Sequence, residues 1–165
     1  MEPIKAIDIK KGMKISELVD GFNDMGFNAN KIAKASEVLK EMKKDKDCKK
    51  FFGFAGAMVP AGMKKIVIDM IKEEYIDVFV TTGANITHDL MEALGENHYK
   101  GDSNIDDKKL NEKGIDRIYN VFMKNSVYEK LEDFFEKNWD EISKTKDVKE
   151  FLWKIGELID SKDSI

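Results

Sequence analysis

The sequence predicts an α/β fold, a Rossmann-like parallel sheet with flanking helices. Two short apolar runs, residues 51–55 and 76–80, are typical of buried strands, and each precedes a glycine-containing turn and a helical repeat. This order implies a crossover between parallel strands with helices covering the sheet. Ligands bind such sheets at the carboxyl ends of strands, here residues 53–61 and 81–87.

Composition narrows the classes of function. The 165 residues suffice for about one domain, and 42% hydrophobic with 36% charged residues indicates a globular protein. A net charge of −4 and a single arginine, Arg117, argue against nucleic-acid binding. The one cysteine, Cys48, excludes internal disulfides and is expected to be an inert thiol. Without an apolar membrane span or a secretory leader, we expect a cytoplasmic protein that does not bind membranes.

A helical lead-in is predicted over about residues 1–50. Apolar spacing predicts a helix over 15–25, Gly26 breaks it, and Asn28 or Asn30 is expected to cap a second helix. The charged run 43–50 is expected to be a solvated turn. The apolar face of the second helix comprises Ile32, Ala35, Val38, Leu39 and Met42.

The βαβα core is predicted over about residues 51–95. Pro60 is expected in the first turn of a helix. A third helix is predicted from Ile86 or Thr87 to Leu94, with Gly95 as its stop. The buried face of the helix after Pro60 comprises Met63, Ile66, Val67, Met70 and Ile71.

A long loop and C-terminal helices are predicted over about residues 96–160. The polar segment 96–120 is expected to be a functional loop or an arm that packs on another subunit. Its acidic cluster, which begins at Asp102, lacks the glycine and terminal glutamate of a calcium loop. Amphipathic helices are predicted around 128–135 and 148–159.

Residues 53–62 (GFAGAMVPAG) form the first candidate site. Small residues let the backbone approach a phosphate or ribose, and a helix N-terminus behind them favours anions. The spacing is not that of a G-x-G-x-x-G fingerprint, so a tight turn without a ligand stays an equal alternative.

The second candidate site, residues 81–89 (TTGANITHD), carries more polar side chains. His88 and Glu92, four residues apart on a helix, form a carboxylate–imidazole pair that can bind a cationic amine, move a proton or hold a metal. Alternatively, Thr87 or Asn85 caps the helix, and Asp89 favours its N-terminus. His98 is the only other histidine, so no metal site is expected.

At these strand ends the sequence resembles deoxyhypusine synthase in its archaeal form. The resemblance covers essentially the whole chain in the order of that family. Its motifs are residues 52–62 (FGFAGAMVPAG), 77–90 (DVFVTTGANITHDL), 98–101 (HYKG), 114–120 (GIDRIYN) and the early stretch 22–28 (FNDMGFN).

The resemblance implies a transferase that uses NAD to oxidise spermidine. The aminobutyl group passes through an imine on an enzyme lysine to one lysine of a translation factor, and the family is a homotetramer with sites between subunits. Thr87 and His88 stand where eukaryotic members carry two glutamates that meet spermidine and the cofactor. By the same resemblance, Thr87, His88 and Asp89 would contact spermidine. The residues that would line the NAD site are Gly56, Ala57, Met58, Val59, Pro60, Thr82, Gly83, Ala84 and His88.

Two departures from the family pattern shape the expected function. The pair Thr87–His88 replaces two acids, and a bacterial branch with a similar His-Asp arrangement makes homospermidine, so the acceptor is either a protein lysine or a small amine. The nucleophilic lysine of the family lies in a glycine-rich segment that would fall beyond Ile165. We therefore expect the N-terminal part of a larger doubly wound domain, inactive alone, in an oligomer with synthase subunits or with a C-terminal half. A non-catalytic accessory paralogue is the alternative.

Overall fold

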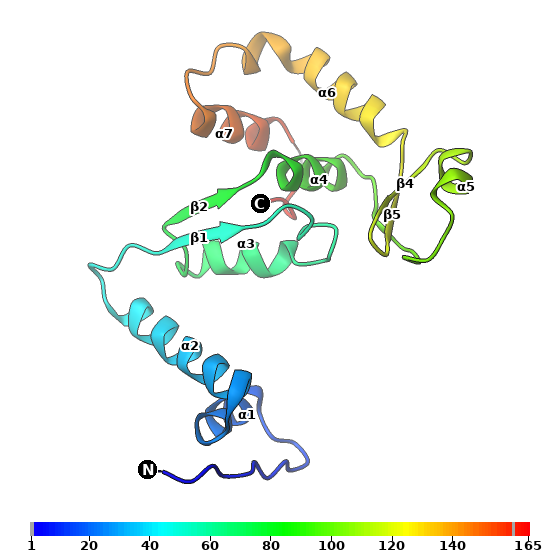
Figure 1. Ribbon diagram of the computed structural model, residues 1–165. Helices are drawn as coiled ribbons and strands as arrows, with labels where there is room; N and C mark the ends of the chain where they lie inside the picture. Colours follow the sequence, from blue (N-terminus) through cyan, green and yellow to red (C-terminus); the bar gives the residue numbers. More distant parts are fainter. Residues whose placement is uncertain (1, 160) are drawn as a thin grey trace. The chain divides into compact units, whose positions relative to one another are not determined.

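The computed structural model describes residues 2–159 and 161–165 (Figure 1). The chain divides into two units, Met1–Lys50 and Phe51–Ile165, and each is described by itself. In the described chain, no helix combines the length and the apolar character needed to cross a membrane.

The first unit contains two helices joined by a short 3₁₀ turn. Helix α1 spans Ile15–Gly21, the turn spans Phe22–Asp24 and α2 spans Phe27–Lys44. The expected asparagine caps are wrong: Gly26 is the N-cap, and the Asn30 side chain donates to the carbonyl of Asn23 instead (2.7 Å). Of the α2 residues, only Ala33 is buried, and much of the predicted apolar face is exposed.

Strands β1 (Phe51–Phe54) and β2 (Val78–Thr81) pair in parallel, in the register Phe51↔Val78 and Phe54↔Thr81. The predicted parallel pair is confirmed. The expectation that β1 is buried on both faces is wrong, because Phe51 is 70% exposed while Phe54 is 5% exposed. One face carries the ring cluster of Phe52, Phe54 and Phe79, which packs with residues of the following loop and of α3.

Helices α3 (Lys64–Lys72) and α4 (Gly83–Ala93) follow the two strands. Pro60 does not lie in a helix, because the chain turns through Gly62 at φ +85° before α3 begins. Helix α3 buries Val67 and Ile68, whereas the predicted face included Ile66, which is 53% exposed.

Helix α4 begins earlier than expected, directly after β2, with Thr82 as its N-cap. Thr87 therefore lies inside the helix and does not cap it. Gly95, at φ +90°, follows the end of α4 as predicted, in a conformation that favours glycine.

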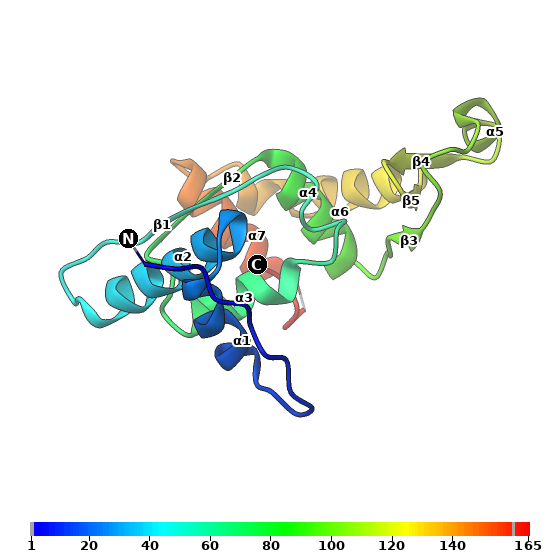
Figure 2. The same ribbon diagram turned by 60° about the horizontal axis from the view of Figure 1, so that its bottom comes forward.

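The segment expected to be a long loop is folded. It contains β3 (Tyr99–Lys100), α5 (Asp107–Asn111) and β4 (Ile115–Ile118), and with β5 (Val121–Lys124) it forms an antiparallel sheet of order β3-β5-β4. The side chain of Asp106 caps α5, and Arg117 binds Asp107 through two nitrogens. Figure 2 shows these elements grouped at one end of the second unit.

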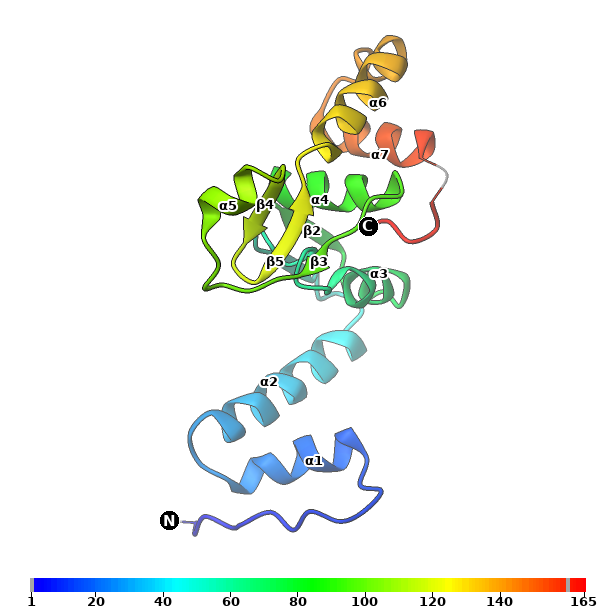
Figure 3. The ribbon, with the colours of Figure 1, turned by 90° about the vertical axis from the view of Figure 1, so that its right-hand side faces the viewer.

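Helices α6 (Val127–Ile142) and α7 (Val148–Leu158) complete the fold. Both predicted amphipathic helices are confirmed. They share the larger apolar cluster with Leu90 and Met91 of α4, and Figure 3 shows the three helices side by side. The second unit is thus a mixed α/β fold with a small parallel sheet, consistent with a partial Rossmann-like domain.

Candidate functional site

The carboxyl ends of β1 and β2 meet, as the sequence predicts. A Cβ atom added to Gly56 would lie 3.2 Å from Oγ1 of Thr82 and 3.9 Å from Cβ of Ala84. Thr82, Gly83 and Ala84 are exposed. The two strand ends therefore form one surface of small residues, where a side chain at position 56 would crowd its neighbour.

The side chain of Asn85 ties the two strand ends together. Its Oδ1 accepts from the backbone N–H of Val59 (3.1 Å), and its Nδ2 donates to the carbonyl of Ala55 and to Oγ1 of Thr81 (2.9 Å). Asn85 is 1% exposed, so these bonds replace the water that its amide would otherwise need. The expected role of Asn85 as a helix cap is wrong.

The loop after β1 has an exposed part and a buried part. Ala57 is exposed and adopts φ +84°, whereas Val59 is 1% exposed and Pro60 is buried. Met58 packs against the apolar cluster around Phe54. Of the residues expected to line a cofactor here, Ala57 is thus exposed, Gly56 is half-buried against Thr82, and Val59 holds the loop through its amide.

An open groove of about 620 Å³ lies beside this loop. One side is formed by Ala57, Pro60 and Ala61. The other residues lining it are His98, Tyr99, Lys100, Gly101, Ile118, Tyr119, Asn120 and Val121. The groove therefore joins the first candidate site to the antiparallel sheet.

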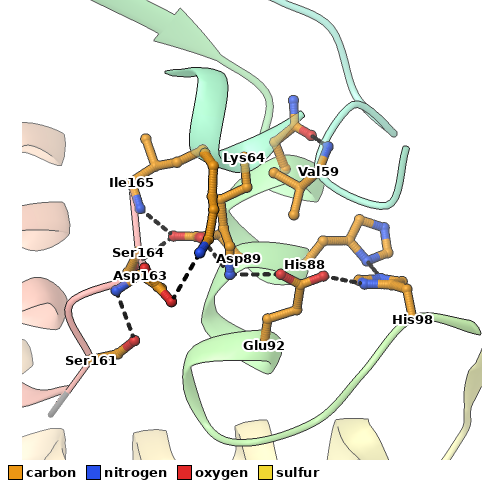
Figure 4. Close-up of polar contacts among 12 residues, drawn as sticks. Val59, Lys64, His88, Asp89, Glu92, His98, Ser161, Asp163, Ser164 and Ile165 are labelled. Carbon is orange, nitrogen blue, oxygen red and sulfur yellow. Dashed lines mark hydrogen bonds and ion pairs between the residues drawn. The ribbon is translucent and has the colours of Figure 1, made fainter. Parts of the chain in front are cut away.

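A chain of polar contacts runs along α4 (Figure 4). Nδ1 of His88 lies 3.0 Å from Nε2 of His98, and Nδ1 of His98 lies 2.7 Å from Oε1 of Glu92. The other oxygen of Glu92 lies 2.6 Å from Nζ of Lys64 on α3. His88 and Glu92, predicted to pair with each other, are therefore joined through His98.

Asp89 is the most buried of the residues that make these polar contacts. Its Oδ2 accepts from Oγ of Ser164 (2.6 Å) and from the backbone N–H of Ile165 (2.9 Å). Its Oδ1 is buried without a hydrogen-bond partner among the described residues, 3.9 Å from Nζ of Lys64. Burial raises the pKa of Asp89, although its hydrogen bonds and the charge of Lys64 act in the opposite direction.

The pKa values of Glu92 and His88 are also shifted, and both are lowered. Burial by itself would raise the pKa of Glu92, but hydrogen bonds from Lys64 and His98 outweigh it and lower that pKa. Burial lowers the pKa of His88. Glu92 is therefore held as a carboxylate and His88 as a neutral imidazole.

Sequence reasoning missed Lys64 and the roles of Asn85 and His98. Lys64 has 13% of its side chain exposed and joins two carboxylates, but nothing in the sequence separates it from the other lysines. His98 was available as the only other histidine, and its partnership with His88 required knowing that the start of β3 returns to α4. Thr87 is half-buried within α4, next to His88 in the chain.

Comparison with known proteins gives one consistent family. A family model described as deoxyhypusine synthase matches residues 17–165. "Probable deoxyhypusine synthase" of Methanosarcina thermophila is 41% identical over 164 residues, which are 99% of this chain and 52% of that protein. "Probable deoxyhypusine synthase 1" of Archaeoglobus fulgidus is 40% identical over 157 residues, 95% of this chain and 52% of that protein.

A bacterial protein also matches. "Deoxyhypusine synthase-like protein" of Elusimicrobium minutum is 36% identical over 164 residues, 98% of this chain and 44% of that protein. The chain spans about half the length of the curated relatives it matches.

Proposed function

This chain belongs to the deoxyhypusine synthase family, and we propose that it forms part of the site at which such an enzyme binds NAD and spermidine. The proposed reaction transfers the aminobutyl group of spermidine to one lysine of a translation factor. The cofactor, when bound, would accept a hydride from the amine and return it. The proposed role of this chain is to bind and orient both molecules.

The observation that carries the proposal is the close approach of Gly56 to Thr82 at the paired strand ends. Any side chain at position 56 would bring its Cβ to 3.2 Å from Oγ1 of Thr82 and force that side chain to shift, so glycine favours an open surface here. Gly83 and Ala84 begin α4 without a side-chain cap, so backbone N–H groups in its first turn remain for a phosphate or ribose oxygen. The residues present therefore fit a nucleotide cofactor.

We assign the polar side chains of α4 to the amine substrate. His88, Asp89 and Thr87 lie in consecutive positions after the surface of small residues, and Asp89 supplies a buried carboxylate. Lys64 and Glu92 hold this group in place through ion pairs. No lysine of this chain is assigned as the nucleophile, which we place in a C-terminal half or in other synthase subunits. The chain alone is then expected to form no deoxyhypusine.

The acceptor separates this proposal from a second one. Thr87 and His88 present no negative charge of their own, which favours a homospermidine-forming enzyme that acts on a small amine. Incubation of the assembled protein, with the subunit or half that supplies the lysine, with spermidine, NAD and either a lysine-bearing translation factor or putrescine distinguishes the two by product. Deoxyhypusine supports the first proposal, and homospermidine supports the second.

Mass spectrometry of the purified protein, denatured and then native, is the first measurement. A second polypeptide carrying a glycine-rich lysine segment would complete the proposed enzyme. Deoxyhypusine formed by the 18.9 kDa chain alone would contradict the assignment of the nucleophile.

The cofactor site is tested by a bulky substitution at the strand ends. Ala84→Trp fills the surface beside Gly56, so NAD binding measured by calorimetry on the assembled protein should be lost. Ala35→Trp, at an exposed helical alanine of the first unit, is the matched control and should bind NAD normally. Unchanged activity in Ala84→Trp would instead indicate a non-catalytic accessory paralogue.

A further inference from the structure

The polar chain on α4 ends at a ring nitrogen that the fold leaves open. His88 is bound through Nδ1 to His98, and its Nε2 makes no hydrogen bond to any described residue (Figure 4). His88 is half-buried, so this nitrogen is neither fully solvated nor sealed in the core. What Nε2 can bind depends on whether it carries the ring proton.

Glu92 determines where the protons of the histidine pair lie. Its carboxylate is held ionised by Nζ of Lys64 at 2.6 Å and can only accept hydrogen bonds. Nδ1 of His98, 2.7 Å away, must therefore carry a proton and donate. In the neutral form of His98, the lone pair is then on Nε2, which faces His88.

His98 in turn fixes the position of the proton on His88. With the lone pair of His98 at 3.0 Å, Nδ1 of His88 must donate, so the ring proton of neutral His88 is on Nδ1. Burial disfavours the imidazolium form of His88 and keeps it neutral. Nε2 of His88 is then an acceptor.

We propose that Glu92 and His98 are positioning residues that fix His88 as the Nδ1-protonated tautomer, so that Nε2 accepts an N–H from an amine. The amine as ligand rests on the proposed function, whereas the tautomer does not. A neutral acceptor selects primary and secondary amines or ammonium groups that have an N–H, and offers nothing to a carboxylate, a phosphate or a quaternary ammonium.

The chain contains only two histidines, which makes the tautomer directly measurable. In the 165-residue chain labelled with ¹⁵N-histidine, long-range ¹H–¹⁵N spectra should show both rings with pyrrole-like Nδ1 and pyridine-like Nε2. His98→Phe leaves His88 as the single histidine, and its spectrum should move toward the Nε2-protonated form that free imidazole favours. An Nε2-protonated His88 in the unmodified chain overturns the proposal.

A second variant keeps the test valid where His98→Phe fails to fold, as judged by backbone amide spectra. Glu92→Gln lets an amide N–H face His98, so the His88 tautomer should become mixed. Glu96→Gln is the matched control, because Glu96 pairs with Lys130 outside this chain of contacts, and it should leave both rings unchanged. If His98→Phe or Glu92→Gln folds and leaves the His88 spectrum unchanged, the positioning role of His98 and Glu92 is contradicted.

Amine binding is tested in a separate experiment. On the assembled protein, spermidine should shift the Nε2 resonance of His88, and tetramethylammonium chloride at equal ionic strength should not. His98→Phe should weaken spermidine binding about tenfold, the effect of one hydrogen bond. An Nε2 that ignores spermidine overturns the acceptor role. An Nε2 that responds while no aminobutyl product forms contradicts only the proposed function.

Discussion

The side-chain oxygen of Asn85 lies 3.1 Å from the backbone nitrogen of Val59, 26 residues earlier in the chain. This bond fixes the loop after β1 against the first turn of α4. Because Nδ2 of the same side chain serves Ala55 and Thr81, one amide sets the spacing of both strand ends.

Asn85→Asp keeps the shape of the side chain but replaces a donor by an acceptor. An oxygen would then face the carbonyl of Ala55, so the free energy of unfolding in urea should fall by about 2–3 kcal/mol. Asn104→Asp, at an exposed position of the same unit, should change it by less than about 0.5 kcal/mol. Equal losses of unfolding free energy in the two variants would argue that the hydrogen bonds of Asn85 do not hold the strand ends together.

Lys64→Met removes the cation shared by the buried carboxylate of Asp89 and the half-buried carboxylate of Glu92. The loss leaves Asp89 and Glu92 without a counter-charge, and stability at neutral pH should fall by about 3 kcal/mol. The neighbour Lys65 offers a matched control, since its side chain is 73% exposed and pairs with Asp163 at the surface. Lys65→Met should cost less than about 0.5 kcal/mol in the same denaturation experiment.

His88 should make stability depend on pH just below neutrality. The unfolded chain protonates this histidine at about pH 6.5, but the folded chain does so only at lower pH because burial lowers its pKa. Between these two values the unfolded state binds more protons, so acidification favours unfolding. The difference in unfolding free energy between the unmodified chain and His88→Gln should therefore shrink as pH falls below about 6.5.

That comparison isolates one group, because Lys64, Asp89, Glu92 and His98 are present in both proteins. Asp89 contributes with the opposite sign, since its raised pKa makes the folded state bind a proton first as pH falls. A difference that stays flat from about pH 7 to about pH 5.5 would mean that the pKa of His88 is not lowered.

Ala57→Gly should stabilise the protein. Ala57 adopts φ +84°, which is unfavourable for a residue with a Cβ, and glycine relieves this at a smaller entropic cost. We expect a gain of about 0.5–1 kcal/mol in thermal or urea unfolding. Ala55→Gly, two residues earlier and without a positive φ, should instead lose about 0.5–1 kcal/mol.

The sequence predicted those parts of the fold that local patterns determine. Continuous apolar runs located β1 and β2. Helical spacing located α6 and α7, because burial of one helix face imposes a period of about 3.6 residues. The sheet β3-β5-β4 was missed, since its strands have two to four residues and their pairing depends on contacts distant in the chain. The asparagine caps failed because capping depends on where the preceding turn places each backbone N–H.

The candidate site was predicted only in outline. The strand ends and His88 followed from topology and residue type. The partners did not: Asp89 meets Ser164 across 75 positions, and Lys64 meets Glu92 from another helix. A side chain's role in such a network is set by its neighbours in space, which no spacing rule within one segment encodes.

Helix α4 presents Leu90 and Met91 to the largest apolar cluster while His88 and Glu92 of the same helix make the polar contacts of the site. Amide hydrogens around the site should consequently exchange with solvent as slowly as those of the core, because neither can open without the other. Mutations that loosen the packing of α6 and α7 against α4 would then disturb the geometry of His88 and His98 without contacting either residue.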